Sequence, residues 1–135
     1  MKNSNDLNLK KIRGDFGEVT VRDYLIKRGY RVIASNYRKR VGEIDIIAVF
    51  DIDKEVIFIE VKTRKQGGLI EGVESVNHTK RQKIFKTARA FIAENPQFCR
   101  MNTRFDVAEV TITGGESPQL LKIDYYEDAF NPIFL

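Results

Sequence analysis

Three charged side chains interrupt the most hydrophobic stretch of the sequence, residues 42–63, which reads GEIDIIAVFDIDKEVIFIEVKT. Asp45 lies in the first apolar run, and Glu60 and Lys62 lie in the second. Carboxylate oxygens are ligands for divalent cations such as Mg²⁺. A lysine beside such a cation can orient a water molecule and neutralise charge that develops on a phosphoryl group. These residue types therefore suit metal-assisted hydrolysis of a phosphodiester.

The two apolar runs predict a β-hairpin that brings the carboxylates together. If Asp51–Lys54 forms a symmetric turn, Asp45 faces Glu60 and Glu43 faces Lys62. Directly opposed side chains have Cβ atoms about 4.5–5.5 Å apart, so that Asp45 and Glu60 could hold one cation. The period of two places the neighbouring apolar side chains on the opposite face of the hairpin. These are Ile44, Ile46, Ile59 and Val61.

Electrostatic repulsion makes an idle cluster of this kind unfavourable. Like charges that face each other in a sheet cost up to about 1 kcal/mol, and more when water is excluded. Bound Mg²⁺ or Mn²⁺ would remove that repulsion. The alternative is that these residues form two cross-strand pairs that face solvent, with their negative charges compensated by Lys62 and nearby arginines.

A further acid, Glu18, lies on the expected inner face of the first helix. Gly14, Glu18, Val21 and Leu25 follow one another at spacings of four, three and four, which places them on one stripe. Gly14 and Gly17 lie in or just before the first turn of this helix. Glycine costs roughly 1 kcal/mol relative to alanine inside a helix, so the missing side chains of these two residues could admit a backbone, a water molecule or a phosphate. Alternatively, Glu18 pairs with a basic neighbour and the glycines mark a frayed helix start.

The elements that must position these residues can be predicted from periodicity and turn signals. Helical spacing and strand-like runs favour an α/β protein with a mixed β-sheet flanked by helices, in the order α-β-β-β-α-β plus a C-terminal strand. We expect a flexible segment over residues 1–12 and a single domain over 13–135. The expected helices cover 15–28 and 77–94, and the expected strands cover 31–38, 43–50, 55–62, 103–113 and 120–125.

Basic residues are concentrated in the first three quarters of the chain. The net charge is +4, yet residues 105–135 contain six acids and a single base, Lys122. Residues 27–40 contain six bases and no acid, and a second basic set falls on the helix expected over 77–94. Clusters of this kind are typical of nucleic-acid contacts, although solvated faces are the alternative. The candidate nucleic-acid-binding residues are Arg38, Lys39, Arg40, Arg64 and Lys80.

Composition excludes several other classes of protein. Cys99 is the only cysteine, so an intrachain disulfide and a paired-cysteine zinc site are excluded. No apolar stretch has the length of a signal peptide or of a membrane span. We therefore expect a soluble, cytoplasmic protein that does not bind membranes. No phosphate-binding glycine motif or nucleophile elbow is present in the sequence.

Several motifs together resemble the YraN-type family of small bacterial proteins. They are GDFGE, NYR, GEIDII, IFIEVKTR, a helix with KRQKI and the strand RFDV, which together span about residues 14–110. That family is assigned to the restriction-endonuclease-like nucleases and is similar to archaeal Holliday junction resolvases. The wider superfamily often has a proline before the aspartate, where this chain has Ile44.

The resemblance implies a role for each matching residue. Asp45 and Glu60 would be metal ligands, Lys62 the catalytic lysine and Glu18 an additional helix acid that takes part in catalysis and metal binding. The implied cofactor is Mg²⁺ or Mn²⁺. The implied activity is hydrolysis of DNA phosphodiester bonds, in branched or repair and recombination intermediates.

Other functions stay open on the sequence alone. The runner-up is a nucleic-acid-binding module of the same fold with little or no cleavage activity. A third reading is an adaptor whose basic faces bind acidic protein surfaces. The DNA could be branched or single-stranded, and the protein could form a homodimer.

Overall fold

The computed structural model describes residues 4–67 and 77–131, and it confirms the expected α/β fold. The elements follow one another in the order helix, three strands, helix, two strands, with a short 3₁₀ helix after the second α-helix. They are α1 (Ser4–Lys27), β1 (Arg31–Lys39), β2 (Gly42–Phe50), β3 (Glu55–Lys65), α2 (His78–Glu94), η1 (Pro96–Phe98), β4 (Asn102–Ile112) and β5 (Leu120–Tyr126).

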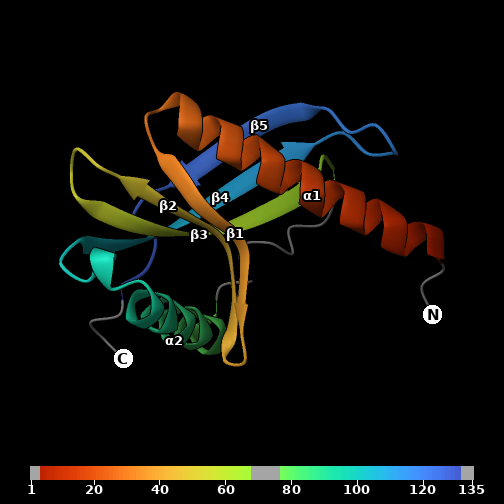
Figure 1. Cartoon of the computed structure of the whole chain (residues 1–135). Coiled ribbons are helices and arrows are strands. Elements are labelled where there is room, and N and C mark those ends of the chain that lie inside the picture. The colour runs from red at the N-terminus through yellow and green to blue at the C-terminus, as the bar shows by residue number, and fades with distance from the viewer. Residues whose placement is uncertain (1–3, 68–76, 132–135) are drawn as a thin grey trace.

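The five strands form one mixed sheet in the order β1-β2-β3-β4-β5. Only β3 and β4 are parallel, because α2 connects them across one face of the sheet (Figure 1). The β2–β3 hairpin has the expected register, with Ile46 opposite Ile59 and Phe50 opposite Glu55. The expected turn is also present, since the Lys54 amide donates to the Asp51 carbonyl over 3.2 Å. This arrangement is consistent with a restriction-endonuclease-like core.

Each face of the sheet is covered by one helix and has its own apolar core. Val21 and Leu25 of α1 pack on one face, and Ile84, Phe85 and Phe91 of α2 pack on the other. The helical spacing of these side chains explains why both helices lie flat on the sheet. A side chain of the central strands therefore packs under α1 or under α2, depending on the face of the sheet to which it belongs.

The first helix begins earlier than the sequence predicted. It starts at Ser4 rather than at Asp15, so residues 4–12 of the expected flexible segment are helical. Leu9 and Ile12 are half-buried and precede Phe16 at spacings of three and four, which extends the inner stripe toward the N-terminus. Residues 1–3 lie outside the described part of the chain.

The hairpin of β1 and β2 bends away from the sheet and reaches α2 (Figure 1). Only glycine fits at the contact, because a Cβ on Gly42 would lie 2.8 Å from Thr87 Oγ1 and 3.2 Å from the Lys83 carbonyl. The bend ends the ladder between β2 and β3 at the Ile46–Ile59 pair. Ile44 consequently belongs to the core under α2 and Ile46 to the core under α1, which corrects the expectation that they share a face.

On the N-terminal side of Ile46, the pairing of β2 also differs from the prediction for Glu43. Glu43 pairs with Arg38 of β1, and their Oε2 and Nε atoms lie 3.3 Å apart, so it does not face Lys62. Because of the bend, residues 42–44 of β2 pair with β1 and not with β3. Neither α1 nor α2, as described, is long and apolar enough to cross a membrane.

Candidate metal centre

Asp45 lies at the point where β2 separates from β3. Its Oδ2 accepts a hydrogen bond of 2.8 Å from the backbone amide of Val61. The amide that would continue the ladder therefore donates to a side chain, which fixes the Asp45 carboxylate against the edge of β3. This bond positions Asp45 beside Glu60 although the two residues are not a ladder pair.

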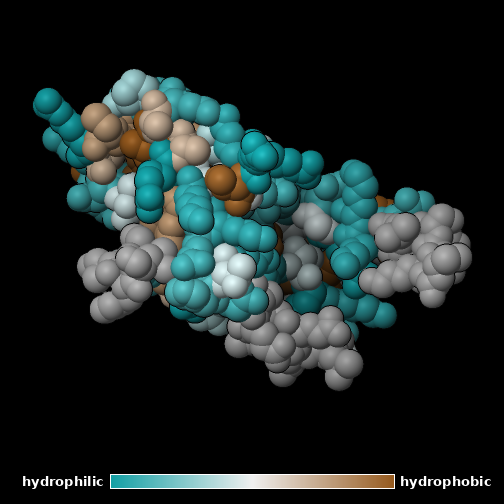
Figure 2. Space-filling model, turned by 90° about the horizontal axis from the view of Figure 1, so that it is seen from below, coloured by the Kyte–Doolittle hydropathy of each residue, from teal (hydrophilic) through white to brown (hydrophobic). Residues whose placement is uncertain are grey.

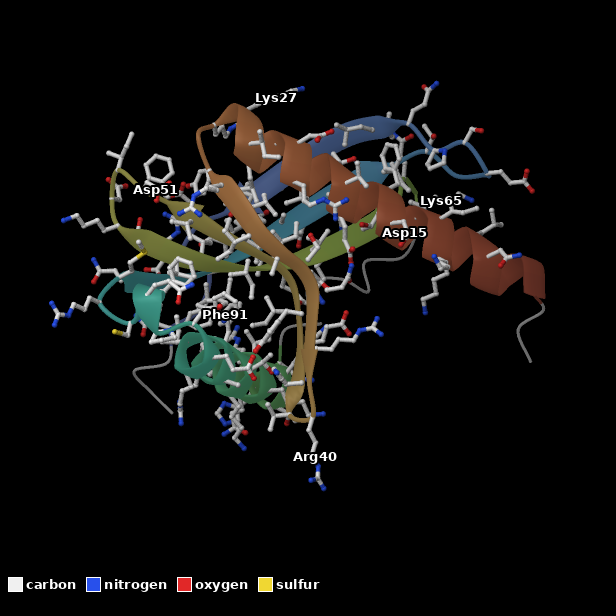
Figure 3. The ribbon with its side chains drawn as sticks, in the orientation of Figure 1. Asp15, Lys27, Arg40, Asp51, Lys65 and Phe91 are labelled. Carbon is white, nitrogen blue, oxygen red and sulfur yellow. The ribbon has the colours of Figure 1, made fainter. Side chains whose placement is uncertain are left out.

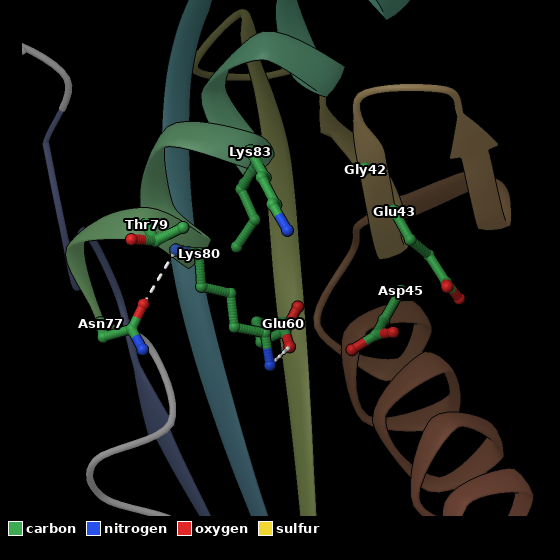
Figure 4. Close-up of a pocket in the computed structure, with 9 residues that line it drawn as sticks. Gly42, Glu43, Asp45, Glu60, Asn77, Thr79, Lys80 and Lys83 are labelled. Carbon is green, nitrogen blue, oxygen red and sulfur yellow. Dashed lines mark hydrogen bonds and ion pairs between the residues drawn. The ribbon is translucent and has the colours of Figure 1, made fainter.

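Glu60 is buried, with only 10% of its side chain exposed, and it lies between two lysines. Its Oε1 is 3.0 Å from Lys80 Nζ and 3.7 Å from Lys62 Nζ. Glu60 and Lys62 belong to β3, whereas Lys80 reaches Glu60 from the first turn of α2 (Figure 4). Glu60 and Lys62 therefore share a face of β3, as the period of two predicts, and Lys80 joins them from α2.

The electrostatic state of the cluster follows from burial and like charge. Burial and the neighbouring charge of Glu60 raise the pKa of Asp45 to about 7, although the Val61 amide opposes this rise. Burial and the adjacent Lys80 lower the pKa of Lys62 to about 8. Burial acts to lower the pKa of Lys80, but the charges of Glu60 and Asp45 together with hydrogen bonds to Glu60 and Lys62 shift it upward. The site thus holds two acidic and two basic side chains. The two acids repel each other, and so do the two lysines.

A cavity of about 540 Å³ opens beside the carboxylates, between β2, β3 and the start of α2 (Figure 4). Asp45, Glu60, Lys80 and Lys83 contribute charged groups to its lining. Asn77 caps α2 by accepting a hydrogen bond of 2.9 Å from the Lys80 backbone amide, and this fixes the first turn of the helix, from which Lys80 reaches the cavity. The cavity could admit a phosphate group next to the carboxylate pair.

Glu18 lies in a neighbouring cavity rather than in the carboxylate pair. Its Oε2 accepts a hydrogen bond of 3.0 Å from Asn36 Nδ2. This second cavity, of about 590 Å³, is lined by α1 and by the β1–β2 hairpin, and Glu43 lines both cavities. Glu18 is still close enough for its charge to raise the pKa of Asp45.

The sequence predicts Asp45, Glu60 and Glu18 as ligands of a divalent cation. Within residues 4–67 and 77–131, no three Asp, Glu, His or Cys side chains gather closely enough to hold one metal ion. The structure therefore brings Asp45 and Glu60 together but does not add Glu18 to them. A pair of carboxylates is nevertheless a suitable set for Mg²⁺, which commonly takes one or two carboxylates and fills its other positions with water and substrate phosphate.

The basic candidates on the β1–β2 hairpin differ in how free their charges are. Arg38 pairs with Glu43, and Lys39 pairs with Glu94 at the end of α2. Arg40 forms no ion pair with any residue that the structure describes, and it points away from the body of the protein (Figure 3). Of the three candidates on this hairpin, two are thus paired with acids within the protein.

Arg64 and Lys83 complete the comparison with the sequence predictions. Arg64 Nη2 lies 4.0 Å from Glu109 Oε2 on the neighbouring strand β4, and it is not part of the cavity lining. Lys83 lines the cavity although it was not among the candidate site residues. Its position three residues after Lys80 on a helix was the signal that could have identified it.

Comparison with known proteins identifies the family. A family model described as "Uncharacterised protein family UPF0102" matches residues 17–110. A UPF0102 protein of Caldicellulosiruptor bescii is 44% identical over 124 residues, which cover 92% of this chain and 100% of that protein. The UPF0102 protein YraN of Salmonella agona is 38% identical over 123 residues, 90% of this chain and 86% of that protein. With this agreement along most of its length, the chain belongs to the UPF0102 family.

Proposed function

We propose that this protein is a metal-dependent nuclease that hydrolyses phosphodiester bonds in DNA. The observation that carries the proposal is the placement of Asp45 and Glu60 side by side, next to Lys62 and Lys80, at a cavity on the α2 side of the sheet. Burial and mutual repulsion make this pair unfavourable without a cation, as the raised pKa of Asp45 indicates. A site that is costly in the empty protein is typical of function.

Each residue has a definite role in this proposal. Asp45 and Glu60 hold the cation, and the Val61 amide fixes the orientation of Asp45. A bound Mg²⁺ or Mn²⁺ supplies a Lewis acid that polarises the phosphate. Lys62 orients the attacking water and stabilises negative charge that develops on the phosphoryl oxygens. Glu18 affects the site through its charge, from the neighbouring cavity.

One observation favours a second candidate, a nucleic-acid-binding module without cleavage. Glu60 already has an internal counter-ion, since the Lys80 ammonium lies 3.0 Å from it. If no cation displaces Lys80, Lys80 and Lys83 can still contact a phosphate at the cavity without hydrolysing it. The same residues would then serve binding alone.

Cleavage assays with metal and charge variants separate the two candidates. Labelled branched, flapped, linear and single-stranded DNAs are incubated with the protein in Mg²⁺, Mn²⁺ or EDTA. We expect cleavage of at least one substrate with a divalent cation and none in EDTA. Lys62→Met should slow single-turnover cleavage by a factor on the order of 10² or more, as for other preorganised electrostatic groups, while affinity measured in Ca²⁺ changes little.

The controls address contamination and charge. Lys62→Arg should not restore the rate, because a planar guanidinium directs its donors differently from an ammonium. Equal cleavage by the wild type and Lys62→Met would mean that the activity does not come from this site. Metal-independent binding with no cleavage of any substrate would favour the binding module.

A further inference from the structure

We propose that α2 is the surface that guides the phosphate backbone of the nucleic acid to the candidate metal centre. This inference rests on the proposed function and adds the path of the substrate strand. The path is a row of four basic residues, here called the α2 basic row. It consists of Lys80, Lys83, Lys86 and Arg89.

The spacing of the α2 basic row forms a continuous line of charge. Its members follow one another every three residues, so that each is displaced by about 4.5 Å along the helix axis from the one before. Residues three apart are neighbours on a helix surface. From Lys80 to Arg89 the row advances about 13.5 Å along the helix axis and turns by about 180° around it, so it crosses the exposed side of α2 obliquely.

The row begins at the candidate metal centre and ends on the solvent side of the helix. Lys80 contacts Glu60, and Lys83 lines the same cavity. Lys86 and Arg89 are exposed on the face of α2 that points away from the sheet. Figure 2, which shows the molecule from the side on which α2 lies, is largely hydrophilic over this region. A strand that followed the row would pass from open solvent into the cavity.

The outer charges of the row are available to a ligand. Within the part of the chain that the structure describes, Lys83, Lys86 and Arg89 form no ion pair with an acid. Glu94 is the only acid on α2, and it is already engaged by Lys39 and by the Tyr37 hydroxyl, which donates to it over 3.1 Å. A cationic surface without internal counter-ions is complementary to a polyanion.

The chemistry of the row indicates what it recognises. Lysine ammonium groups contact phosphates as point charges, and contacts to phosphate carry no sequence information. The partner is therefore the backbone of a nucleic acid, bound independently of sequence. Arg40 extends the same surface from the tip of the hairpin, on the side of the molecule on which α2 lies (Figure 3).

The inference can be tested through the outer half of the row, which does not contact the carboxylates. Lys86→Gln/Arg89→Gln is compared with Lys27→Gln/Arg28→Gln, which removes two exposed bases at the end of α1. Lys27 lies far from α2 (Figure 3). Affinity for fluorescent DNA is measured in Ca²⁺ and in EDTA over a range of salt concentrations. Thermal melting verifies that both variants are folded.

We expect only the α2 variant to lose affinity and salt dependence. The slope of log affinity against log salt should decrease by about 1.4 for a single strand or about 1.8 for a duplex, since each lost phosphate contact contributes about 0.7 or 0.9. Affinity should decrease equally for DNAs of unrelated sequence. Equal slopes for the α2 variant, the control variant and the wild type would overturn the inference, as would an absence of DNA binding by the wild type.

The readout keeps this inference separate from the proposed activity. Binding in EDTA does not require cleavage, so loss of affinity in the α2 variant supports the row even if no substrate is cut. Conversely, metal-dependent cleavage by the wild type together with unchanged binding by the α2 variant retains the nuclease and overturns the row. Polyglutamate that competes as strongly as DNA of equal charge would indicate an acidic protein partner and would also overturn it.

Discussion

Two aspartates on different strands show how a structural carboxylate differs from one that is available for chemistry. Asp106 on β4 is completely buried, and Asp45 on β2 is half-buried at the edge of a cavity. Both lie near basic side chains, and both interrupt apolar strands. The number and kind of their partners separate them.

Asp106 is fully satisfied by its surroundings. Arg104 binds it with Nε–H at 2.9 Å and Nη2–H at 2.8 Å, the Tyr125 hydroxyl donates over 2.6 Å, and the Asp128 amide donates over 2.9 Å. Burial and the charge of Asp106 raise the pKa of Tyr125, which keeps the phenol protonated. With every oxygen engaged by donors, Asp106 has no capacity left for a ligand.

Asp45, in contrast to Asp106, has few hydrogen-bond donors and several like charges around it. One backbone amide, that of Val61, donates to it, while Glu60, Glu18 and Glu43 repel its charge. Its environment raises the pKa to about 7, whereas a structural ion pair would stabilise the ionised form. The comparison indicates that a partly buried carboxylate facing other acids, and not burial alone, marks the candidate site.

The largest expected difference between the two sites is in stability. Asp106→Asn leaves the Arg104 charge buried without its main partner, and the loss of one member of a buried pair typically costs about 3–5 kcal/mol. Chemical denaturation should therefore show a large destabilisation. Asp51→Asn is the matched control, because it removes an exposed partner of Arg31 and should leave the midpoint nearly unchanged. Equal destabilisation by both variants would contradict a structural role for the Asp106 network.

Asp45→Asn should have the opposite sign and stabilise the metal-free protein. Asparagine keeps the shape and the oxygen that accepts from Val61, but it removes the repelled charge. In EDTA at pH 8 we expect the melting temperature to rise by several degrees, corresponding to roughly 1–2 kcal/mol after allowance for solvent screening. Added Mn²⁺ should raise the melting temperature of the wild type but not that of the variant.

The pH dependence of stability tests separately whether Asp45→Asn stabilises the metal-free protein. The folded state raises the pKa of Asp45 from 3.8 to about 7, so the stability contributed by its protonated form is complete below about pH 4 and is lost as the pH rises through 7. The advantage of Asp45→Asn should therefore vanish near pH 4 and be largest above pH 7. A melting-temperature difference that is constant from pH 4 to 8 would show that the repulsion at Asp45 is absent.

A smaller effect is expected at Lys80, the internal counter-ion of Glu60. A divalent cation that binds Glu60 must compete with this ammonium, which lies 3.0 Å from Oε1. Lys80→Gln should therefore tighten Mn²⁺ binding, by about fivefold for a partly exposed pair worth about 1 kcal/mol. Calorimetric titration checks this, with Lys65→Gln as a control at an exposed position on the same strand as Glu60. Weaker Mn²⁺ binding by Lys80→Gln would mean that Lys80 supports the site instead of competing for it.

Local signals explain which features of the fold could be predicted from the sequence. The Asp51–Lys54 turn and the β2–β3 register follow from alternation and turn length, which involve neighbouring residues. The end of that ladder at Ile46 could not be predicted in this way. It depends on contact between Gly42 and Thr87, residues that are remote in sequence.

The same distinction applies to the candidate site. Asp45, Glu60 and Lys62 were identified by their types and spacing, and the structure places them together. Glu18 shares an inner helix stripe as expected, but its hydrogen bond to Asn36 depends on the path of the hairpin. The pairing of Lys39 with Glu94 is likewise a tertiary contact that periodicity does not reveal.

Two glycines of α1 extend the comparison of structural and functional positions and carry the smallest predicted effect. A Cβ on Gly17 would lie 1.8 Å from Thr63 Oγ1, so packing of α1 on β3 requires glycine there. A Cβ on Gly14 would meet no described atom within 4 Å, and Gly14 lines the cavity that contains Glu18. Packing thus explains Gly17 but does not explain Gly14.

Gly14→Ala should stabilise the protein by up to about 1 kcal/mol, because alanine is the better helix former and no clash opposes it. Gly17→Ala is the paired variant and should destabilise the protein by forcing α1 away from Thr63. If the open space at Gly14 admits a phosphate or a water molecule, Gly14→Ala should also weaken DNA binding or cleavage while the melting temperature rises. Denaturation and binding measured on the same samples decide the point: a stabilised variant with wild-type binding and cleavage would show that Gly14 serves neither packing nor ligand, and would limit the functional region to the carboxylate pair and α2.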